Sequence, residues 1–237
     1  MGEQKDRIDE TEWDALIILD AGRADVFGNI YDIFDTLGGG DLDVVSNGGM
    51  GFTANWMAHH FPDDYDALFS HGGQPIYSME GGTTWDERAH FHGKIPPYTE
   101  YEWDELIGTC WPDEVNDIVR HYADPDDRIV VRYLCPHPPF PGLPELTRGR
   151  GNRTRQIAKA VRSGDISVDD VWDAYEQWYL TGLEAADELA EWTNGTVCVT
   201  ADHGECLGDC GQWFHGPTPG SHEPHDHLTD VPWLVVE

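Results

Sequence analysis

The chain has 237 residues, of which 39% are hydrophobic and 11% aromatic, and its formal net charge is −31. This length and apolar content exclude a disordered chain and predict a single α/β domain over residues 1–237. The excess of 45 acidic over 14 basic residues excludes nucleic acid and anionic membranes as general partners. Acidic residues spread through every segment are typical of proteins from salt-loving microbes, where high ionic strength screens the repulsion.

The first 12 residues are polar and charged, and no apolar run approaches the length of a membrane span. We therefore predict a cytoplasmic protein without a membrane segment. The cysteines are odd in number and lack C-x-x-C spacing, which predicts reduced thiols: Cys110, Cys135, Cys198, Cys206 and Cys210. Because histidines follow the Cys206-x-x-x-Cys210 pair, a zinc site there is the alternative.

The first predicted strand covers residues 13–19 and is apolar enough to lie at the centre of a sheet. A helix is expected over residues 23–34, ended by the glycines that follow Leu37. A short strand is expected over residues 42–45, and the glycine-rich turn 46–52 follows it.

The next predicted element is a helix over residues 53–60, with Thr53 near its N-cap and Pro62 after its end. A strand over residues 65–70 comes next. Residues 72–112 lack a clear period and are interpreted as an elaborated loop region.

The second half of the chain predicts a helix over residues 112–122 and a strand over residues 128–134. The proline-rich loop 135–141 then presents His137 at a strand end. The longest predicted helix covers residues 168–192.

Strands at residues 197–201 and 231–236 complete the pattern. Strands that alternate with helices predict an α/β fold with a mostly parallel central sheet flanked by helices.

Two of the predicted strands end in a carboxylate. The strand that begins near Trp13 runs into Asp20, and the strand at residues 197–201 runs into Asp202 and His203. In open α/β sheets, ligands bind at the carboxyl ends of the strands. If the two ends are neighbours, they offer two oxygens and one nitrogen to a divalent cation, which predicts a metal site. The alternative is a capping aspartate beside a hydrogen-bonded histidine.

Thr53 combines a hydroxyl with a helix start behind a glycine-rich turn. Such a turn lets backbone N–H groups approach an anion, and the helix dipole favours negative charge there. A metal ion nearby would favour the deprotonated hydroxyl. Thr53 is therefore a candidate nucleophile.

Taken in order, these motifs resemble the alkaline phosphatase superfamily, and within it the sulfatase-like hydrolases in the short form common in halophilic archaea. The residues that carry the resemblance are Leu-Ile-Ile-Leu-Asp20, Thr53, Pro-His137-Pro-Pro-Phe, Thr-Ala-Asp202-His203-Gly-Glu, His215-Gly and Val-Pro-Trp, with the segment 164–175. The likeness covers nearly the whole chain and implies the alkaline phosphatase and sulfatase-like fold.

The resemblance also implies roles. Asp20, Asp202 and His203 would hold the metal, and Thr53 would be the nucleophile and a possible fourth ligand. His137 would steady the substrate oxyanion or the leaving group, and His215 would be a second histidine of the site. The implied reaction is in-line attack on a small anionic ester, a covalent phosphothreonine, and transfer to water or another acceptor.

Departures from the family pattern refine this expectation. The sulfatase motif C/S-x-P-x-R is replaced by Phe52-Thr-Ala-Asn-Trp56, so phosphate esters and phosphodiesters are favoured over sulfate esters. Ala21 stands where a second aspartate is frequent, and no Asp-x-x-x-His motif is convincing. One divalent ion is therefore favoured over two, and Mn²⁺, Zn²⁺ and Mg²⁺ all suit the ligands. The alternative is a catalytically silent relative that binds metal or an anionic ligand.

Several other features have two interpretations. Arg23 could contact a substrate phosphate or form a salt bridge, and His59-His60 is interpreted as structural. The histidines of a late loop are either a further metal site or solvated residues: His215, His222, His225 and His227. A basic segment is either an anion-binding patch or an exposed mobile stretch: Arg148, Arg150, Arg153, Arg155, Lys159 and Arg162. The oligomeric state is not predicted.

Overall fold

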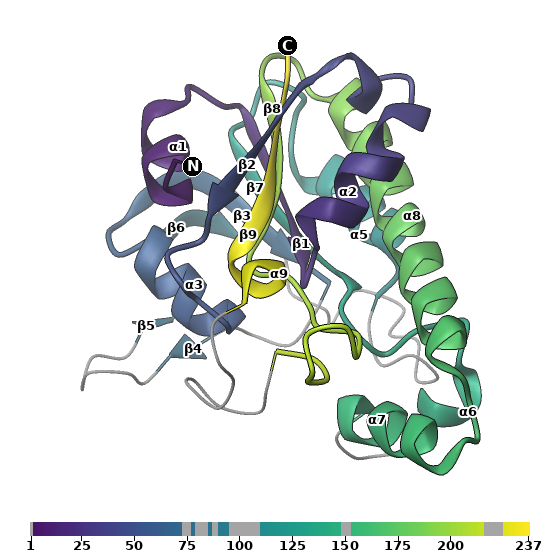
Figure 1. The fold of residues 1–237 in the computed structure, drawn as a ribbon. Coiled ribbons are helices and arrows are strands. Elements are labelled where there is room, and N and C mark those ends of the chain that lie inside the picture. Colours follow the sequence, from purple (N-terminus) through teal and green to yellow (C-terminus); the bar gives the residue numbers. More distant parts are fainter. Residues whose placement is uncertain are drawn as a thin grey trace.

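The computed structural model describes residues 2–72, 77–78, 85–86, 90–94, 110–147, 153–215 and 225–237. Within these ranges a seven-stranded sheet forms the centre of the fold (Figure 1). Its strands, in spatial order, are β2 (Asp41–Ser46), β9 (Asp230–Val236), β8 (Val197–Ala201), β1 (Ala15–Asp20), β7 (Ile129–Pro136), β3 (Tyr65–His71) and β6 (Phe91–Lys94).

Neighbouring strands of this sheet run parallel except where β9 pairs antiparallel with β8 and β2. The predicted mostly parallel α/β sheet is therefore confirmed. Every residue of β1 is buried, as the apolar run of its sequence predicted. The described residues also include a two-stranded sheet of β4 (Tyr77–Ser78) and β5 (Trp85–Asp86).

Helices cover both faces of the sheet (Figure 1). On one face lie α2 (Ala24–Ile30), α5 (Pro112–Tyr122) and the long α8 (Val168–Trp192). On the other lie α1 (Gln4–Glu10) and α3 (Thr53–His60). The remaining helical segments are two 3₁₀ turns (Tyr31–Ile33 and Leu37–Gly39), α6 (Pro144–Thr147), α7 (Arg153–Ser163) and α9 (Asp226–Thr229).

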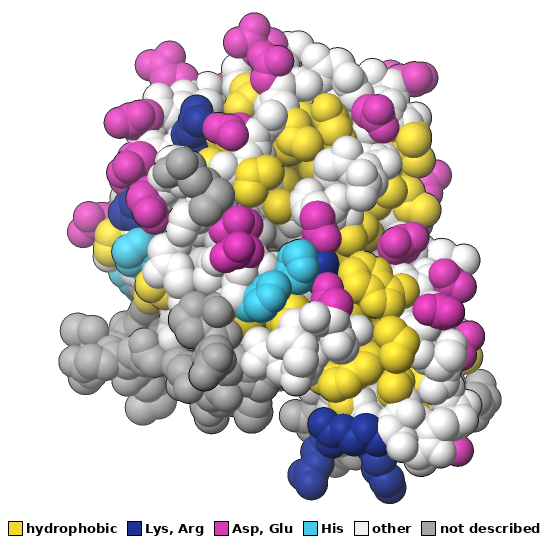
Figure 2. Space-filling view, in the orientation of Figure 1, with side chains coloured by type: hydrophobic (Ala, Val, Ile, Leu, Met, Phe, Trp, Pro, Cys, Tyr) yellow, Lys and Arg dark blue, Asp and Glu magenta, His cyan; other side chains and the backbone are white. Residues whose placement is uncertain are grey.

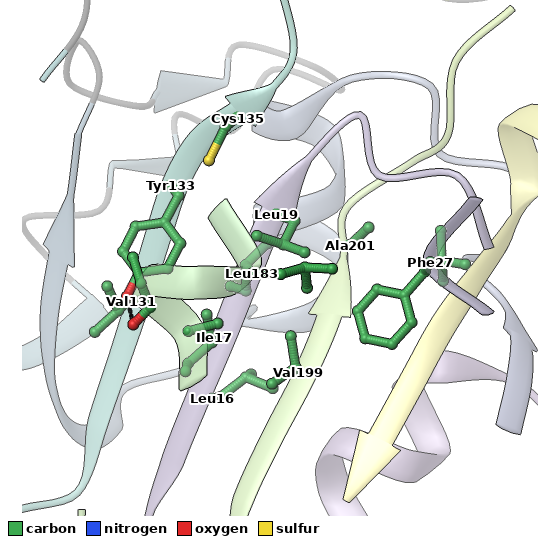
Figure 3. Packing of buried hydrophobic residues seen from close by; sticks show 14 of the residues in the cluster. Leu16, Ile17, Leu19, Phe27, Val131, Tyr133, Cys135, Leu183, Val199 and Ala201 are labelled. Carbon is green, nitrogen blue, oxygen red and sulfur yellow. Dashed lines mark hydrogen bonds between the residues drawn. The ribbon is translucent and has the colours of Figure 1, made fainter. Parts of the chain in front are cut away.

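Alternation along the strands decides which side chains meet α8. Ile17, Leu19, Tyr133 and Cys135 pack with Leu183 of α8 (Figure 3). Because successive strand residues point to opposite faces, the even-numbered residues of β1 and β7 point to the α1 and α3 face. This alternation directs the polar ends of the strands towards the start of α3.

Three sequence predictions need correction. Residues 1–12 are more than a charged lead-in, since they contain α1, whose Gln4 and Ile8 are buried. Residues 141–165, for which the sequence predicted no helix or strand, contain α6 and α7. The predicted helix 23–34 is shorter, because α2 ends at Ile30 and a 3₁₀ turn continues it.

Helices 53–60 and 168–192 have the predicted bounds. Most of the predicted loop region 72–112 lies outside the described residues, which include β4, β5 and β6 within it. Among the described helices, none is long and apolar enough to span a bilayer. That residues 1–237 form one domain stays a prediction.

Candidate active site

Asp20, Asp202 and His203 meet at the carboxyl ends of β1 and β8, which are hydrogen-bonded neighbours in the sheet. All three are buried, and one ligand atom from each lies within 4.8 Å of the others. His203 Nε2 is 3.6 Å from Asp20 Oδ1 and 3.7 Å from Asp202 Oδ2. The prediction that these two strand ends are adjacent is confirmed.

The first oxygen of Asp202 is fixed by the backbone. Oδ1 accepts hydrogen bonds from the Ala21 and His203 amides at 3.1 and 2.9 Å. Ala21 itself has a positive φ of 62°, a conformation that non-glycine residues rarely adopt. Its carbonyl accepts a hydrogen bond from the Tyr175 hydroxyl at 2.8 Å, so contacts on both sides hold the turn after Asp20 in place.

Thr53 is brought to the same point by the glycine-rich turn before α3. Gly48 and Gly49 have φ values of 73° and 76° there. The buried Asn47 side chain ties the turn together, because its Nδ2 donates to the Met50 carbonyl at 2.6 Å and to the Asp202 carbonyl at 2.9 Å. Thr53 is then the first residue of α3, after Phe52 as N-cap.

The Thr53 hydroxyl donates to the second oxygen of Asp202, with 2.5 Å between Oγ1 and Oδ2. Its oxygen accepts from Arg132 Nη2 at 3.2 Å. Arg132 Nη2 also forms a short ion pair with Asp20 Oδ2. Thr53 thus lies between the anionic cluster and a buried cation.

A second cluster of potential ligands lies beside the first. His137, Glu205 and His215 have one ligand atom each within 4.8 Å of the others. The His215 ring is 4.4 Å from the His203 ring and 5.2 Å from the His137 ring, measured between centroids. The structure therefore brings both predicted histidines next to the candidate metal ligands.

The two histidines differ in charge. Burial, together with the positive charge of His215, lowers the pKa of His137 to about 3. Burial alone would lower the pKa of His215 as well, but the Glu205 carboxylate 3.0 Å from its Nδ1 outweighs burial and raises the pKa to about 9. At neutral pH, His137 is a neutral imidazole and His215 an imidazolium.

Arg23 does not join these clusters. Its guanidinium is buried, forms ion pairs with Asp25 and Asp209 at 2.6 Å each, and lies over the Trp172 ring. Burial alone would lower the pKa of Arg23, but the hydrogen bonds to the two carboxylates raise it. The salt-bridge interpretation fits these contacts, and a substrate contact at Arg23 stays a prediction.

Cys206 and Cys210 form a disulfide, which corrects the prediction of reduced thiols for this pair. The chain turns at Gly208, where φ is 92°, and brings the two Cα atoms to 5.7 Å, within disulfide range. The other three cysteines are buried thiols.

The late-loop histidines divide between clusters. His225 lies near the disulfide sulfurs, which cannot bind metal as thiolates, and its Nδ1 accepts from the His227 amide at 3.2 Å. His227 Nε2 lies 3.5 Å from Asp209. His222 lies outside the described residues, as do Arg148 and Arg150.

The basic segment forms part of α7. A group of Lys and Arg side chains gathers over this helix, while Asp and Glu side chains are scattered over the rest of the face (Figure 2). Arg155, Lys159 and Arg162 are exposed. Residues 153–163 of the segment are helical, and its interpretation as an anion-binding patch or an exposed mobile stretch stays a prediction.

Sequence reasoning missed three residues of the site. Arg132 is a charged residue within the otherwise apolar run 129–134, which is a visible signal, but its neighbours depend on strand register. Glu205 lies two residues after the predicted ligand His203. Asn47 could be recognised only as part of a glycine-rich turn.

Solved structures with a similar fold include the C-terminal periplasmic domain of phosphoethanolamine transferase EptC from Campylobacter jejuni. It has a TM-score of 0.55 and 15% identity, over 93% of this chain and 77% of that chain. The C-terminal periplasmic domain of EcEptC from Escherichia coli, in complex with Zn, has a TM-score of 0.52 and 13% identity over 94% and 71%. A putative sulfatase from Bacteroides thetaiotaomicron has a TM-score of 0.55 and 13% identity over 94% and 64%.

The chain has an alkaline phosphatase/sulfatase-like fold. The resemblance predicted from the motifs is therefore confirmed for the fold. No family model and no curated protein sequence matches the chain. Because the identities are 15% and below, the comparisons support the fold alone. The reaction has to be inferred from the site. Two of these neighbours are periplasmic domains, and the cytoplasmic location of this chain stays a prediction.

Proposed function

We propose that this protein is a metal-dependent hydrolase or transferase of small phosphate esters or phosphodiesters, with Thr53 as the nucleophile. The observation that carries the proposal is the position of Thr53 Oγ1, 2.5 Å from Asp202 Oδ2 and 3.2 Å from Arg132 Nη2. A hydroxyl between a carboxylate and a cation, at a helix start, is suited to attack a phosphoryl group. Sulfate esters are less favoured because the sulfatase nucleophile motif is absent at residues 52–56.

The donor atoms fit a divalent cation. Asp20 Oδ1 is buried and has no hydrogen-bond partner among the described residues, although the rest of its carboxylate is ion-paired. A cation held by Asp20, Asp202, His203 and Thr53 would satisfy this oxygen. Such an ion would supply Lewis acidity at the phosphoryl oxygen and favour ionisation of the threonine hydroxyl. Mn²⁺, Zn²⁺ and Mg²⁺ remain the candidates, and one ion is favoured.

In the proposed first step, Thr53 Oγ1 attacks phosphorus while the bond to the leaving oxygen breaks on the opposite side. The hydroxyl proton departs along the hydrogen bond to Asp202 Oδ2. In the second step, water or an acceptor hydroxyl attacks phosphorus, the Oγ1–phosphorus bond breaks, and Thr53 recovers a proton. Hydrolysis and transfer differ in this acceptor alone.

The two neighbouring histidines are suited to opposite tasks. His215 carries a proton at neutral pH, because its pKa is raised to about 9 by Glu205 against the effect of burial. We assign it the stabilisation of the phosphoryl oxygens and the proton that the leaving oxygen takes. His137 donates through Nδ1 to the Pro138 carbonyl, which leaves the lone pair of Nε2 as an acceptor. Pairs of titratable groups with pKa values pushed apart are typical of acid–base catalysis.

A catalytically silent protein is the second candidate. The observation that favours it is the ion pair between Arg132 and Asp20, which already satisfies one oxygen of a predicted metal ligand. In that case the site would bind a metal ion or an anion without turnover.

The test is hydrolysis of aryl phosphate, aryl phosphodiester and aryl sulfate esters in high salt with Mn²⁺, Zn²⁺, Mg²⁺ or EDTA. We expect metal-dependent turnover of a phosphate ester or diester, reduced on the order of 10³-fold or more in Thr53→Ala and in Asp202→Asn. Thr181→Ala is the matched control, because this threonine lies on α8 and bonds the Gln177 carbonyl.

Two other outcomes discriminate the alternatives. Phosphorylation of Thr53 without release, seen by mass spectrometry, would identify a transferase that lacks its acceptor. Stoichiometric metal binding without turnover or phosphorylation, unchanged in Thr53→Ala, would identify the silent protein and overturn the proposal.

A further inference from the structure

We propose that Arg132 is a catalytic residue that serves as a fixed second cation of the site, and that it thereby limits the site to one metal ion. The inference rests on the proposed function, in which Thr53 is the nucleophile. It concerns a residue for which neither the motifs nor the comparisons supply a role.

Arg132 is the one charged side chain of β7, whose residues from Ile129 to Tyr133 are all buried. In the sheet it pairs with Ile18 of β1 and His71 of β3, so its backbone lies in the interior of the sheet. The residue is 5% exposed. A charge in such a position is costly unless it is paired, and an apolar residue would pack there more cheaply.

The guanidinium reaches two residues of the site with a single nitrogen. Nη2 donates to Asp20 Oδ2 and to Thr53 Oγ1, the latter at 3.2 Å. Its Nε is buried and has no hydrogen-bond partner in the described part of the chain. The guanidinium therefore keeps donor capacity beyond the two contacts, as expected of a group that also meets an anion.

The contact with Thr53 Oγ1 gives Arg132 its role. When Oγ1 attacks, its proton leaves and negative charge develops on the oxygen that accepts the Arg132 hydrogen bond. A fixed cation at that oxygen stabilises the charge. It does so again in the second step, when Oγ1 is the leaving group. A phosphoryl group attached to Oγ1 lies within reach of the same guanidinium, which is suited to phosphoryl oxygens.

The contact with Asp20 explains why one metal ion suffices. One carboxylate oxygen, Oδ2, is committed to Arg132, and the other, Oδ1, faces His203. A second divalent ion beside Thr53 would have to displace Arg132 or lie against its positive charge. Arg23, equally buried, has no such role, because Asp25 and Asp209 occupy its guanidinium.

The experiment compares Arg132→Gln with wild type in two measurements: ester turnover, and Mn²⁺ or Zn²⁺ binding by isothermal titration calorimetry. We expect turnover to fall about 10²-fold or more, the scale seen when one donor to a developing anion is removed. We expect the metal to bind about tenfold more tightly, or a second ion to bind, because Asp20 loses its competing cation. A misfolded variant would lose both turnover and metal binding. Lower turnover together with tighter metal binding therefore distinguishes the proposed role from misfolding.

Three further variants keep the result interpretable. Arg132→Lys keeps the charge and should retain the wild-type metal stoichiometry with part of the turnover. Arg132→Ala should regain turnover when guanidinium ion is added. Arg128→Gln is the matched control, since Arg128 precedes β7 and lies over the Trp13 ring, and it should change neither metal binding nor turnover.

Two results would overturn the inference: unchanged turnover in Arg132→Gln, or reduced turnover with weaker metal binding and no rescue by guanidinium. If wild type shows neither ester turnover nor phosphorylation of Thr53, the proposed function fails by itself. The metal titration then still decides whether Arg132 holds the place of a second cation.

Discussion

His60 lies buried at the end of α3, 1% exposed and stacked on Trp56 with 4.4 Å between ring centroids. Its Nδ1 is 2.8 Å from the Trp56 carbonyl. Burial lowers the pKa of His60 from 6.5 to about 3, because the imidazolium would lose its hydration. The side chain is therefore neutral in the folded protein at any moderate pH.

This residue predicts a loss of stability in acid. The unfolded chain binds the His60 proton more readily, so the stability present above the unfolded pKa of 6.5 is lost as pH falls towards the folded value of about 3. When the pH is lowered from about 7 to about 5, protonation of His60 in the unfolded chain should decrease the free energy of unfolding by about 2 kcal/mol. Urea denaturation of wild type and His60→Gln at both pH values measures the difference.

His59 supplies the control, because it neighbours His60 and is exposed. His59→Gln should keep most of the pH dependence of wild type, because burial is the largest cause of the low pKa of His60. Equal pH dependence in wild type and His60→Gln would contradict the assignment of a neutral buried imidazole.

Individual residues show which parts of the candidate site could be predicted from the sequence and which could not. Asp20, Asp202 and His203 could be predicted because each follows an apolar strand, and strand ends of a parallel sheet share an edge. Arg132 could not, since the pairing of β7 with β1 is set by contacts between segments more than 100 residues apart.

The packing of α8 against the sheet depends on a glycine. A Cβ added at Gly182 would lie 2.5 Å from Cys135 Sγ of β7 and 3.4 Å from Leu19 Cδ2 of β1. Both neighbours are fully buried. The absence of a side chain at this one position sets how closely the longest helix approaches the strands that hold the site.

Gly182→Ala should therefore destabilise the protein although alanine is the better helix former. Overpacking costs about 1–3 kcal/mol, against about 1 kcal/mol gained in helix propensity, so we expect a net loss on the order of 1 kcal/mol. Denaturation in urea measures it. Glu184→Ala, at an exposed position of the same helix, should change stability by less than about 0.5 kcal/mol.

A compensating change tests the cause. Cys135→Ala removes the sulfur that the new methyl group would meet, so adding it to Gly182→Ala should cost less than it costs in wild type. Simple additivity of the two changes would argue against a steric origin.

Elements were predicted best where the pattern is local. The strong periodicity of residues 168–192 and the turn before Thr53 fixed both helices to their observed bounds. The helix α1 was not predicted. Its Gln4 side chain donates hydrogen bonds to Thr200 and Ala201 on β8, nearly 200 residues away, and these contacts hold the helix in place. No local signal contains such a contact.

The whole molecule carries a net charge of −31, and acidic groups are spread over the face seen in Figure 2. Raising the salt concentration from about 0.1 M to about 1 M shortens the Debye length from about 10 Å to about 3 Å. The mutual repulsion of the carboxylates is then screened, and the compact state repels itself less. We expect the melting temperature to rise by several degrees in potassium chloride, measured by circular dichroism.

Three neighbouring exposed aspartates offer a test of the mechanism. The triple variant Asp63→Asn, Asp64→Asn, Asp66→Asn removes like charges that lie close together before and within β3. Its melting temperature should depend less steeply on salt than that of wild type. A wild-type melting temperature that is flat or falls with salt would count against an origin in a salt-loving organism.

If the proposed metal site is correct, the position of β8 late in the sequence determines when during synthesis the ligands come together. Asp20, Thr53 and Arg132 leave the ribosome long before the strand that begins at Val197 and leads to Asp202 and His203. Until that strand is made, the growing chain has a single ligand carboxylate, and Arg132 is available to neutralise it. In the proposed site a metal ion would be held only once β8 has paired with β1, so ion binding would follow the folding of that strand.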